Sequence, residues 1–96
     1  MALKVLTLKG EEAVAIARAI SSEANFKILR LLSKERLDVS TIAKKLGLSE
    51  PYISEEIKLL QKLQLVTVTY APGKRGIKKI CELAVGKIII EISPRS

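Results

Sequence analysis

The sequence predicts an α+β fold, and three features of the 96-residue chain lead to that prediction. Residues 11–33 and 39–63 carry apolar side chains three and four positions apart, the spacing of amphipathic helices. Residues 66–83 alternate apolar and polar side chains around a basic turn that contains Pro and Gly, as in a β-hairpin. Short runs with strand character lie at 3–8 and 87–92. Because this order of elements is typical of a winged helix-turn-helix, we expect a helical bundle with a β-hairpin wing and short terminal strands.

Composition limits the kind of protein this is. The length allows one domain, and we expect residues 1–96 to form it. The chain is 48% hydrophobic but only 3% aromatic, which predicts an aliphatic core. Its 17 Lys and Arg against 10 Asp and Glu give a net charge of +7. That charge favours a polyanionic partner, with nucleic acid ahead of a membrane surface, although a basic surface can also serve solubility alone.

Cysteine and histidine content bears on compartment and chemistry. Cys81 is the single cysteine and there is no histidine, so an intrachain disulfide is impossible and the commonest metal ligand is missing. The opening residues MALKVLTLKG are too interrupted by lysine for a secretion signal, and no apolar run approaches the ~20 residues that span a bilayer. We therefore expect a soluble cytoplasmic protein, associated with the nucleoid, that has no cofactor, no metal and no membrane contact.

The first two helices supply most of the expected bundle. The helix at 11–20 has a stripe of small and apolar residues, namely Ala13, Ile16, Ala17 and Ile20. This stripe either joins the core or meets the same helix of a second subunit. Ser22 can cap the next helix, whose apolar positions are Phe26, Ile28, Leu29 and Leu32.

Residues 38–63 read as a helix-turn-helix. Asp38 is a suitable N-cap for a helix at 39–46, and Gly47 can end it in a left-handed conformation. Ser49 caps the following helix, with Pro51 in its first turn, where a missing N–H is harmless. The inner positions of this longest helix are Ile53, Ile57, Leu59, Leu60 and Leu63.

The outer surface of that helix and the hairpin tip carry the groups suited to DNA. Side chains of the helix at 49–63 would enter the major groove, and the cations of the wing at 70–79 would meet the backbone or the minor groove. We expect Tyr70 to pack under the hairpin, with contact to the DNA backbone as the alternative. Glu50, Glu55 and Glu56 would repel phosphates. The expected DNA-binding residues are Lys44, Lys45, Ser49, Glu50, Tyr52, Ser54, Lys58, Lys74, Arg75, Lys78 and Lys79.

Across residues 20–82 the chain resembles the ArsR-type winged-helix regulators, especially compact archaeal members without a sensor domain. The resemblance rests on ANFKILRLLSKERLDVSTIAKKLGLSEPYISEEIKLLQKLQLVTV and on the GKRG of the wing. It implies a homodimer that places two recognition helices in successive major grooves of a pseudo-palindromic operator on double-stranded DNA, usually as a repressor.

Two departures from the family pattern affect what the resemblance implies. Metal-sensing members carry a cysteine pair where this chain has Asp38 and Ser40, so metal sensing is not expected here. The C-terminal helix common in family dimers is replaced by the strand at 87–92. We therefore expect the dimer surface to combine the first helix with the terminal strands, through Ala13, Ile16, Ala17, Ile20, Ile88 and Ile90; completion of the monomer core by the same residues is the alternative.

Other functions remain to be weighed against sequence-specific regulation. An enzyme is not expected, because no nucleophile–base pair, paired carboxylates or phosphate-binding glycine loop is present, and Cys81 reads as a small buried hydrophobe. An architectural, chromatin-type DNA-binding protein with little sequence preference is one alternative. A winged helix used as a protein–protein adaptor, with Glu50, Glu55 and Glu56 facing a basic partner, is the other.

Overall fold

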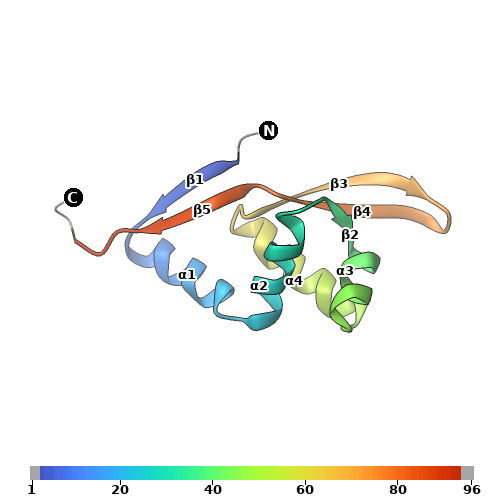
Figure 1. Ribbon diagram of the computed structural model, residues 1–96, viewed down its shortest axis with the longest axis horizontal. Coiled ribbons are helices and arrows are strands. Elements are labelled where there is room, and N and C mark those ends of the chain that lie inside the picture. The colour runs from blue at the N-terminus through green and yellow to red at the C-terminus, as the bar shows by residue number, and fades with distance from the viewer. Residues whose placement is uncertain (1–2, 94–96) are drawn as a thin grey trace.

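Within residues 3–93, four helices and five strands form an elongated molecule whose principal dimensions are 53 × 27 × 19 Å (Figure 1). The structure is a computed structural model and describes residues 3–93. The elements in chain order are β1 (Lys4–Leu8), α1 (Gly10–Ile20), α2 (Glu23–Leu32), β2 (Leu37–Asp38), α3 (Val39–Leu46), α4 (Glu50–Lys62), β3 (Val66–Gly73), β4 (Gly76–Leu83) and β5 (Val85–Ile90). The α+β class, the helical bundle and the hairpin wing are thus confirmed.

Side-chain caps set the starts of three helices, as the sequence predicts. The Oγ of Ser22 accepts from the Asn25 N–H at 3.3 Å and so begins α2. Asp38 and Ser49 accept from the backbone N–H groups three residues on, at 2.9 and 3.2 Å, and begin α3 and α4. Each cap satisfies one of the N–H groups that a helix leaves without an internal partner.

Two small sheets flank the helices. The wing hairpin β3–β4 is antiparallel and runs in register from Val66–Leu83 to Gly73–Gly76, and β2 adds to the other side of β4 through Leu37 and Asp38. The second sheet pairs β1 with β5 in parallel, near the two ends of the chain. Gly86 permits this pairing, because a Cβ there would lie only 3.0 Å from the Cβ of Leu3.

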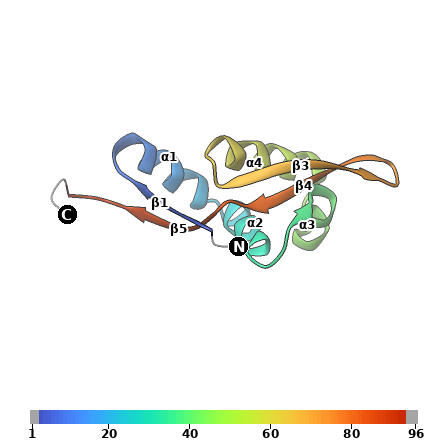
Figure 2. The same cartoon turned by 90° about the horizontal axis from the view of Figure 1, so that it is seen from above.

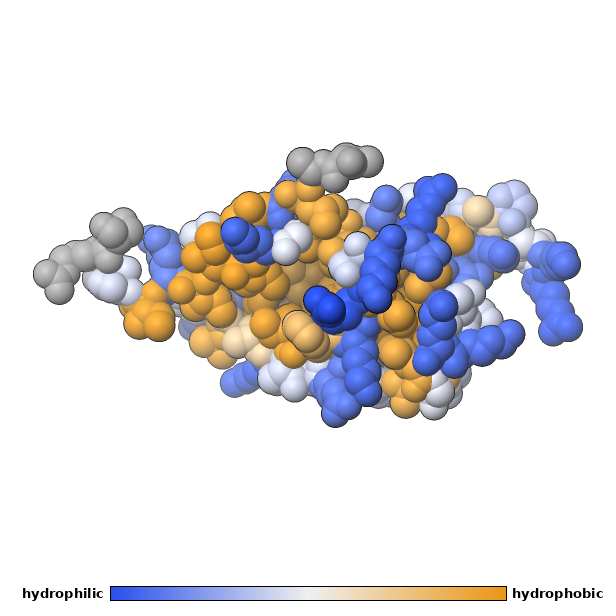
Figure 3. Space-filling view, viewed as in Figure 1, coloured by the Kyte–Doolittle hydropathy of each residue, from blue (hydrophilic) through white to orange (hydrophobic). Residues whose placement is uncertain are grey.

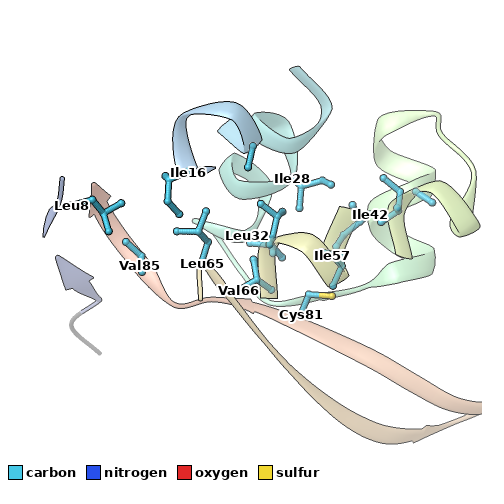
Figure 4. Packing of buried hydrophobic residues seen from close by; sticks show 14 of the residues in the cluster. Leu8, Ile16, Ile28, Leu32, Ile42, Ile57, Leu65, Val66, Cys81 and Val85 are labelled. Carbon is cyan, nitrogen blue, oxygen red and sulfur yellow. The ribbon is translucent and has the colours of Figure 1, made fainter. Parts of the chain in front are cut away.

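The core is aliphatic and runs the length of the helical layer, from Leu8 and Val85 at one end to Ile42 at the other (Figure 4). Ile28, Ile42, Ile53, Ile57 and Leu60 are fully buried at its centre. Burying each such side chain contributes about 1.5–3 kcal/mol, so this one cluster is the main source of stability. Within residues 3–93 no helix is long and apolar enough to cross a membrane.

Four side chains lie elsewhere than the helical and strand periodicities predict. Phe26 and Leu59 are 53% and 40% exposed, because each sits at the edge of its helix's buried stripe. Tyr70 is 69% exposed rather than packed under the hairpin, since the hairpin continues beyond the helices that would cover it. The last strand is Val85–Ile90 instead of 87–92, which leaves Ile92 outside it and 95% exposed.

Candidate nucleic-acid interface

The turn between α3 and α4 has the geometry that a helix-turn-helix requires. Gly47 adopts φ = +68°, a left-handed conformation that is strained for residues with a side chain. The Leu48 N–H donates to the Ala43 carbonyl at 3.0 Å and closes the end of α3. Ala43 is itself buried, and its small side chain lets α4 cross closely. These contacts fix the direction in which α4 leaves the turn.

Helix α4 buries one side and leaves the other open to solvent. Ile53, Ile57 and Leu60 face the core and are completely buried. On the opposite side Tyr52 is 42% exposed, and the ammonium of Lys58 pairs with the Glu55 carboxylate at 3.2 Å. One of the three glutamates that would oppose DNA is therefore paired with a lysine on the same helix, although both side chains are exposed.

The wing projects past the end of α3 and α4, as Figure 2 shows from above. Its tip, between Gly73 and Gly76, carries Lys74 and Arg75, both exposed. Tyr70 and Ile77 also face solvent, at 69% and 78% exposure. A hairpin end that carries cations and lacks a hydrophobic cover is suited to contact a polyanion beyond the body of the protein.

A crevice of about 760 Å³ separates the wing from the first turns of α3 and α4. Its walls bring together six of the residues that the sequence predicts for DNA binding, namely Glu50, Ser54, Lys74, Arg75, Lys78 and Lys79. Four cations thus face the amino-terminal ends of two helices, where the helix dipoles add further positive potential. The crevice also contains the carboxylates of Asp38 and Glu50, so four cations against two acids leave it with a net positive charge that favours an anionic ligand.

Asp38 joins the helix-turn-helix to the wing. Its Oδ1 caps α3 through Thr41, while its Oδ2 lies 3.9 Å from the Nζ of Lys78 on β4. The hydrogen bonds from Thr41, with a smaller contribution from Lys78, hold the pKa of the Asp38 carboxyl below its ordinary value of 3.8. Asp38 is therefore ionised at neutral pH, and its carboxylate lies between the start of α3 and the base of the wing.

The remaining predicted site residues lie outside the crevice. Lys44 and Lys45 are exposed on the last turn of α3, and the Ser49 hydroxyl accepts the capping hydrogen bond. Conversely, the crevice includes residues whose role there the sequence does not predict, namely Asp38, Val39, Ser40, Pro51 and Ile77. Only the pairing of β2 with β4 brings Asp38 to the wing, and such non-local pairing leaves no local sequence pattern.

The residues expected at a dimer surface divide into two groups. Ala13 and Ile16 are 6% and 3% exposed in the core of the single chain and leave almost no surface for a partner. Ala17 is exposed, and Ile20 and Ile88 are half-buried, while Ile90 is 41% exposed. Figure 3 shows that apolar side chains gather around β1, β5 and α1, whereas hydrophilic ones dominate around the wing.

Cys81 lies in the core of the molecule. The Cys81 side chain is completely buried on β4, and burial raises the pKa of its thiol to about 11. In the part of the chain that the structure describes, no group of three or more His, Cys, Asp or Glu side chains is placed to hold a metal ion.

Comparison with protein families shows which known domain this helix-turn-helix matches. Residues 22–68 match the model of the bacterial regulatory protein family arsR. They form an ArsR-family helix-turn-helix domain. The match confirms the predicted resemblance to the ArsR-type regulators over the helix-turn-helix and the first residues of the wing. No curated protein sequence matches the chain.

Solved structures agree with the ArsR-type fold. NolR from Sinorhizobium fredii is 26% identical, covers 77% of this chain and 70% of its own, and superposes with a TM-score of 0.63. HlyU from Vibrio vulnificus is also 26% identical, with coverages of 76% and 72% and a TM-score of 0.60. A homodimeric winged helix-turn-helix DNA-binding domain from Mycobacterium bovis is 20% identical, covers 77% and 65%, and has a TM-score of 0.66. These relatives are bacterial, so the expected archaeal affinity stays a prediction.

Proposed function

We propose that this ArsR-family regulator acts as a homodimeric repressor that binds a specific operator on double-stranded DNA. In this proposal α4 lies in the major groove and presents Tyr52 and Ser54 to base edges, while the wing cations hold the flanking backbone or the minor groove. The crevice between α4 and the wing is the single observation that carries the proposal, because it brings Ser54 of α4 and the wing cations together on one side of the molecule.

The dimer is supported by the family and by the division of the surface. The related domain from Mycobacterium bovis is described as homodimeric. In the present chain the apolar surface lies around β1, β5 and α1, away from the wing, so two copies could associate there and leave both wings free. A chromosomal operator would place the protein in the cytoplasm, at the nucleoid.

Selection of bound duplexes from a random pool, followed by competition with bulk DNA, tests this function. A sequence-specific regulator enriches one pseudo-palindromic site and prefers it to bulk DNA by a factor of about 10³ or more. An architectural protein binds duplexes without enriching any sequence. A protein–protein adaptor binds neither the random pool nor bulk DNA measurably. Either of those two results would overturn the proposal.

A further inference from the structure

The parallel β1–β5 sheet ends in an open edge. Within residues 3–93, β5 is paired with β1 on one side and with no strand on the other. A two-stranded sheet has little stability of its own in water, and an unpaired strand edge offers its N–H and C=O groups to another strand. The free side of β5 is therefore a candidate site for strand addition.

The backbone direction shows which groups this edge presents. Just past β5, the Glu91 N–H donates to the Leu8 carbonyl of β1 at 2.8 Å. Because successive residues of a strand point their backbone groups to opposite sides, Ile89 and Lys87 also face β1, whereas Ile88 and Ile90 face the open edge.

There is room beside this edge. A groove of about 350 Å³ lies between β5 and α2, and its walls include Ile88 and Val85 from one side and Phe26 and Leu29 from the other. Phe26 on the α2 wall is 53% exposed, and Arg30 and Lys87 also line the groove. Along β5 itself, Ile89 and Ile90 are 43% and 41% exposed.

The residues of β5 are complementary to themselves in one antiparallel register. If a two-fold axis passes through Ile89, Lys87 lies opposite Glu91 of the second copy, and Ile88 lies opposite Ile90 of the second copy. Both opposite-charge pairs and apolar pairs across strands are favourable. If the axis passes through Ile88, Lys87 lies opposite Ile89 of the second copy. If it passes through Ile90, Glu91 lies opposite Ile89 instead. Both charge pairs are lost in either register.

The free edge of β1 does not offer the same match. Lys4 begins that strand, Lys9 follows it and no acidic residue lies between them, so two copies of β1 could form no ion pair across strands. Lysines at an exposed strand edge are a common means of preventing such pairing.

The geometry points to β5 as the dimer contact: it pairs antiparallel with β5 of a second copy, about an axis through Ile89, and forms a four-stranded β1–β5–β5–β1 sheet. This inference rests on the homodimer of the proposed function and names its surface. The contact uses strands, in place of the C-terminal helices expected in family dimers.

Disulfide trapping tests the register. The test uses Ile89→Cys in a chain whose Cys81 is replaced by Ala. Position 89 of one copy then lies opposite position 89 of the other, at a Cα separation of about 4.5 Å, which is within the range of a disulfide. Mild oxidation should convert most of the protein to covalent dimer. Val5→Cys is the matched control, since it lies on the same sheet face and is 58% exposed but belongs to β1, three strands from its copy. Failure of Ile89→Cys to cross-link, or equal cross-linking by Val5→Cys, would overturn the register.

Charge reversal tests the contact without a cysteine. Lys87→Glu or Glu91→Lys alone places like charges opposite each other twice per dimer and should raise the dimer dissociation constant by ~tenfold, measured by sedimentation. The double reversal restores the ion pairs and should return the constant to near the original value. Single variants that dimerise normally, or a double variant that is weaker than both singles, would contradict the β5 contact.

The experiments distinguish failure of the β5 contact from failure of the proposed operator-binding function. If the β5 contact is wrong but the chain is a regulator, all of these variants still form the dimer and still prefer the selected operator. If the protein has no operator, the selection experiment on the unmodified chain fails whatever the sedimentation results are.

Discussion

Asp38 contacts Lys78 across the base of the wing, with its Oδ2 3.9 Å from the lysine Nζ, while its Oδ1 caps helix α3. The side chain of Asp38 is only 14% exposed, whereas that of Lys78 is 53% exposed. One carboxylate therefore links the start of the helix-turn-helix to the strand that carries the cationic tip. The ion pair is long and its lysine is solvated, so the cap is the stronger of the two interactions.

Replacement of Asp38 should separate these two interactions. Asp38→Ala removes the cap and the charge and should lower the free energy of unfolding by about 1 kcal/mol, measured by urea denaturation. Asp38→Asn keeps a capping oxygen and should cost clearly less. Equal losses for the two variants would mean that the ion pair, rather than the cap, stabilises this junction.

The same residue should produce a measurable dependence of stability on pH. Hydrogen bonds from Thr41, and then the charge of Lys78, depress the folded-state pKa of Asp38 below 3.8. Its contribution is therefore fully present above the unfolded pKa and is lost as pH falls through the lower folded pKa. The difference in unfolding free energy between the unmodified protein and Asp38→Asn should shrink from pH 5 down to about pH 2; a difference that stays constant would contradict this assignment.

Two left-handed residues should respond oppositely to substitution. Gly47 has φ = +68° at the end of α3, and Gln64 has φ = +65° just after α4. Gly47→Ala should destabilise the protein by about 1 kcal/mol, because a side chain is strained in this conformation. Gln64→Gly should stabilise it by up to a similar amount, offset in part by the greater entropy of glycine when unfolded. Thermal denaturation of both variants checks the signs.

Cys81 should resist thiol reagents in the folded protein. Its side chain is 0% exposed and its pKa is raised to about 11, so at pH 8 only about one molecule in a thousand would carry a thiolate. Reaction with a disulfide reagent should follow the rate of unfolding and should become fast in denaturant. Rapid labelling under native conditions would show that β4 opens from the core.

The wing should act on affinity for DNA of any sequence. Arg75→Ala should weaken binding to all duplexes by a similar factor and should reduce the dependence of log K on log salt by about one unit. Arg18→Ala is the control, because Arg18 is also exposed but lies on α1 and does not line the crevice. The wing would have no phosphate contact at Arg75 if the two variants bound alike.

Local sequence patterns were sufficient to predict the helices, their caps and the wing. Ser22, Asp38 and Ser49 begin helices because their side chains act on N–H groups only three residues away, and Gly47 ends α3 through its own conformational freedom. Interactions of this range can be read from neighbouring residues.

The pairing of strands that are distant in the chain could not be predicted from the sequence. Strand alternation in the sequence already separates Ile88 from Ile89, but nothing near β1 or β5 indicates that the two strands pair in parallel. The link from Asp38 to Lys78 likewise depends on the β2–β4 ladder. Tyr70 was misplaced for a related reason, since strand alternation does not reveal where the supporting helices end.

Selection of DNA by paired variants tests most directly whether α4 reads bases while the wing holds the backbone. The unmodified protein, Ser54→Ala and Arg75→Ala would each be incubated with the same random duplex pool, and the enriched sequences and affinities compared. We predict that Arg75→Ala enriches the original site with lower affinity, whereas Ser54→Ala changes or relaxes the preferred base at one position of each half-site. An unchanged site for Ser54→Ala together with an altered one for Arg75→Ala would contradict this division of roles.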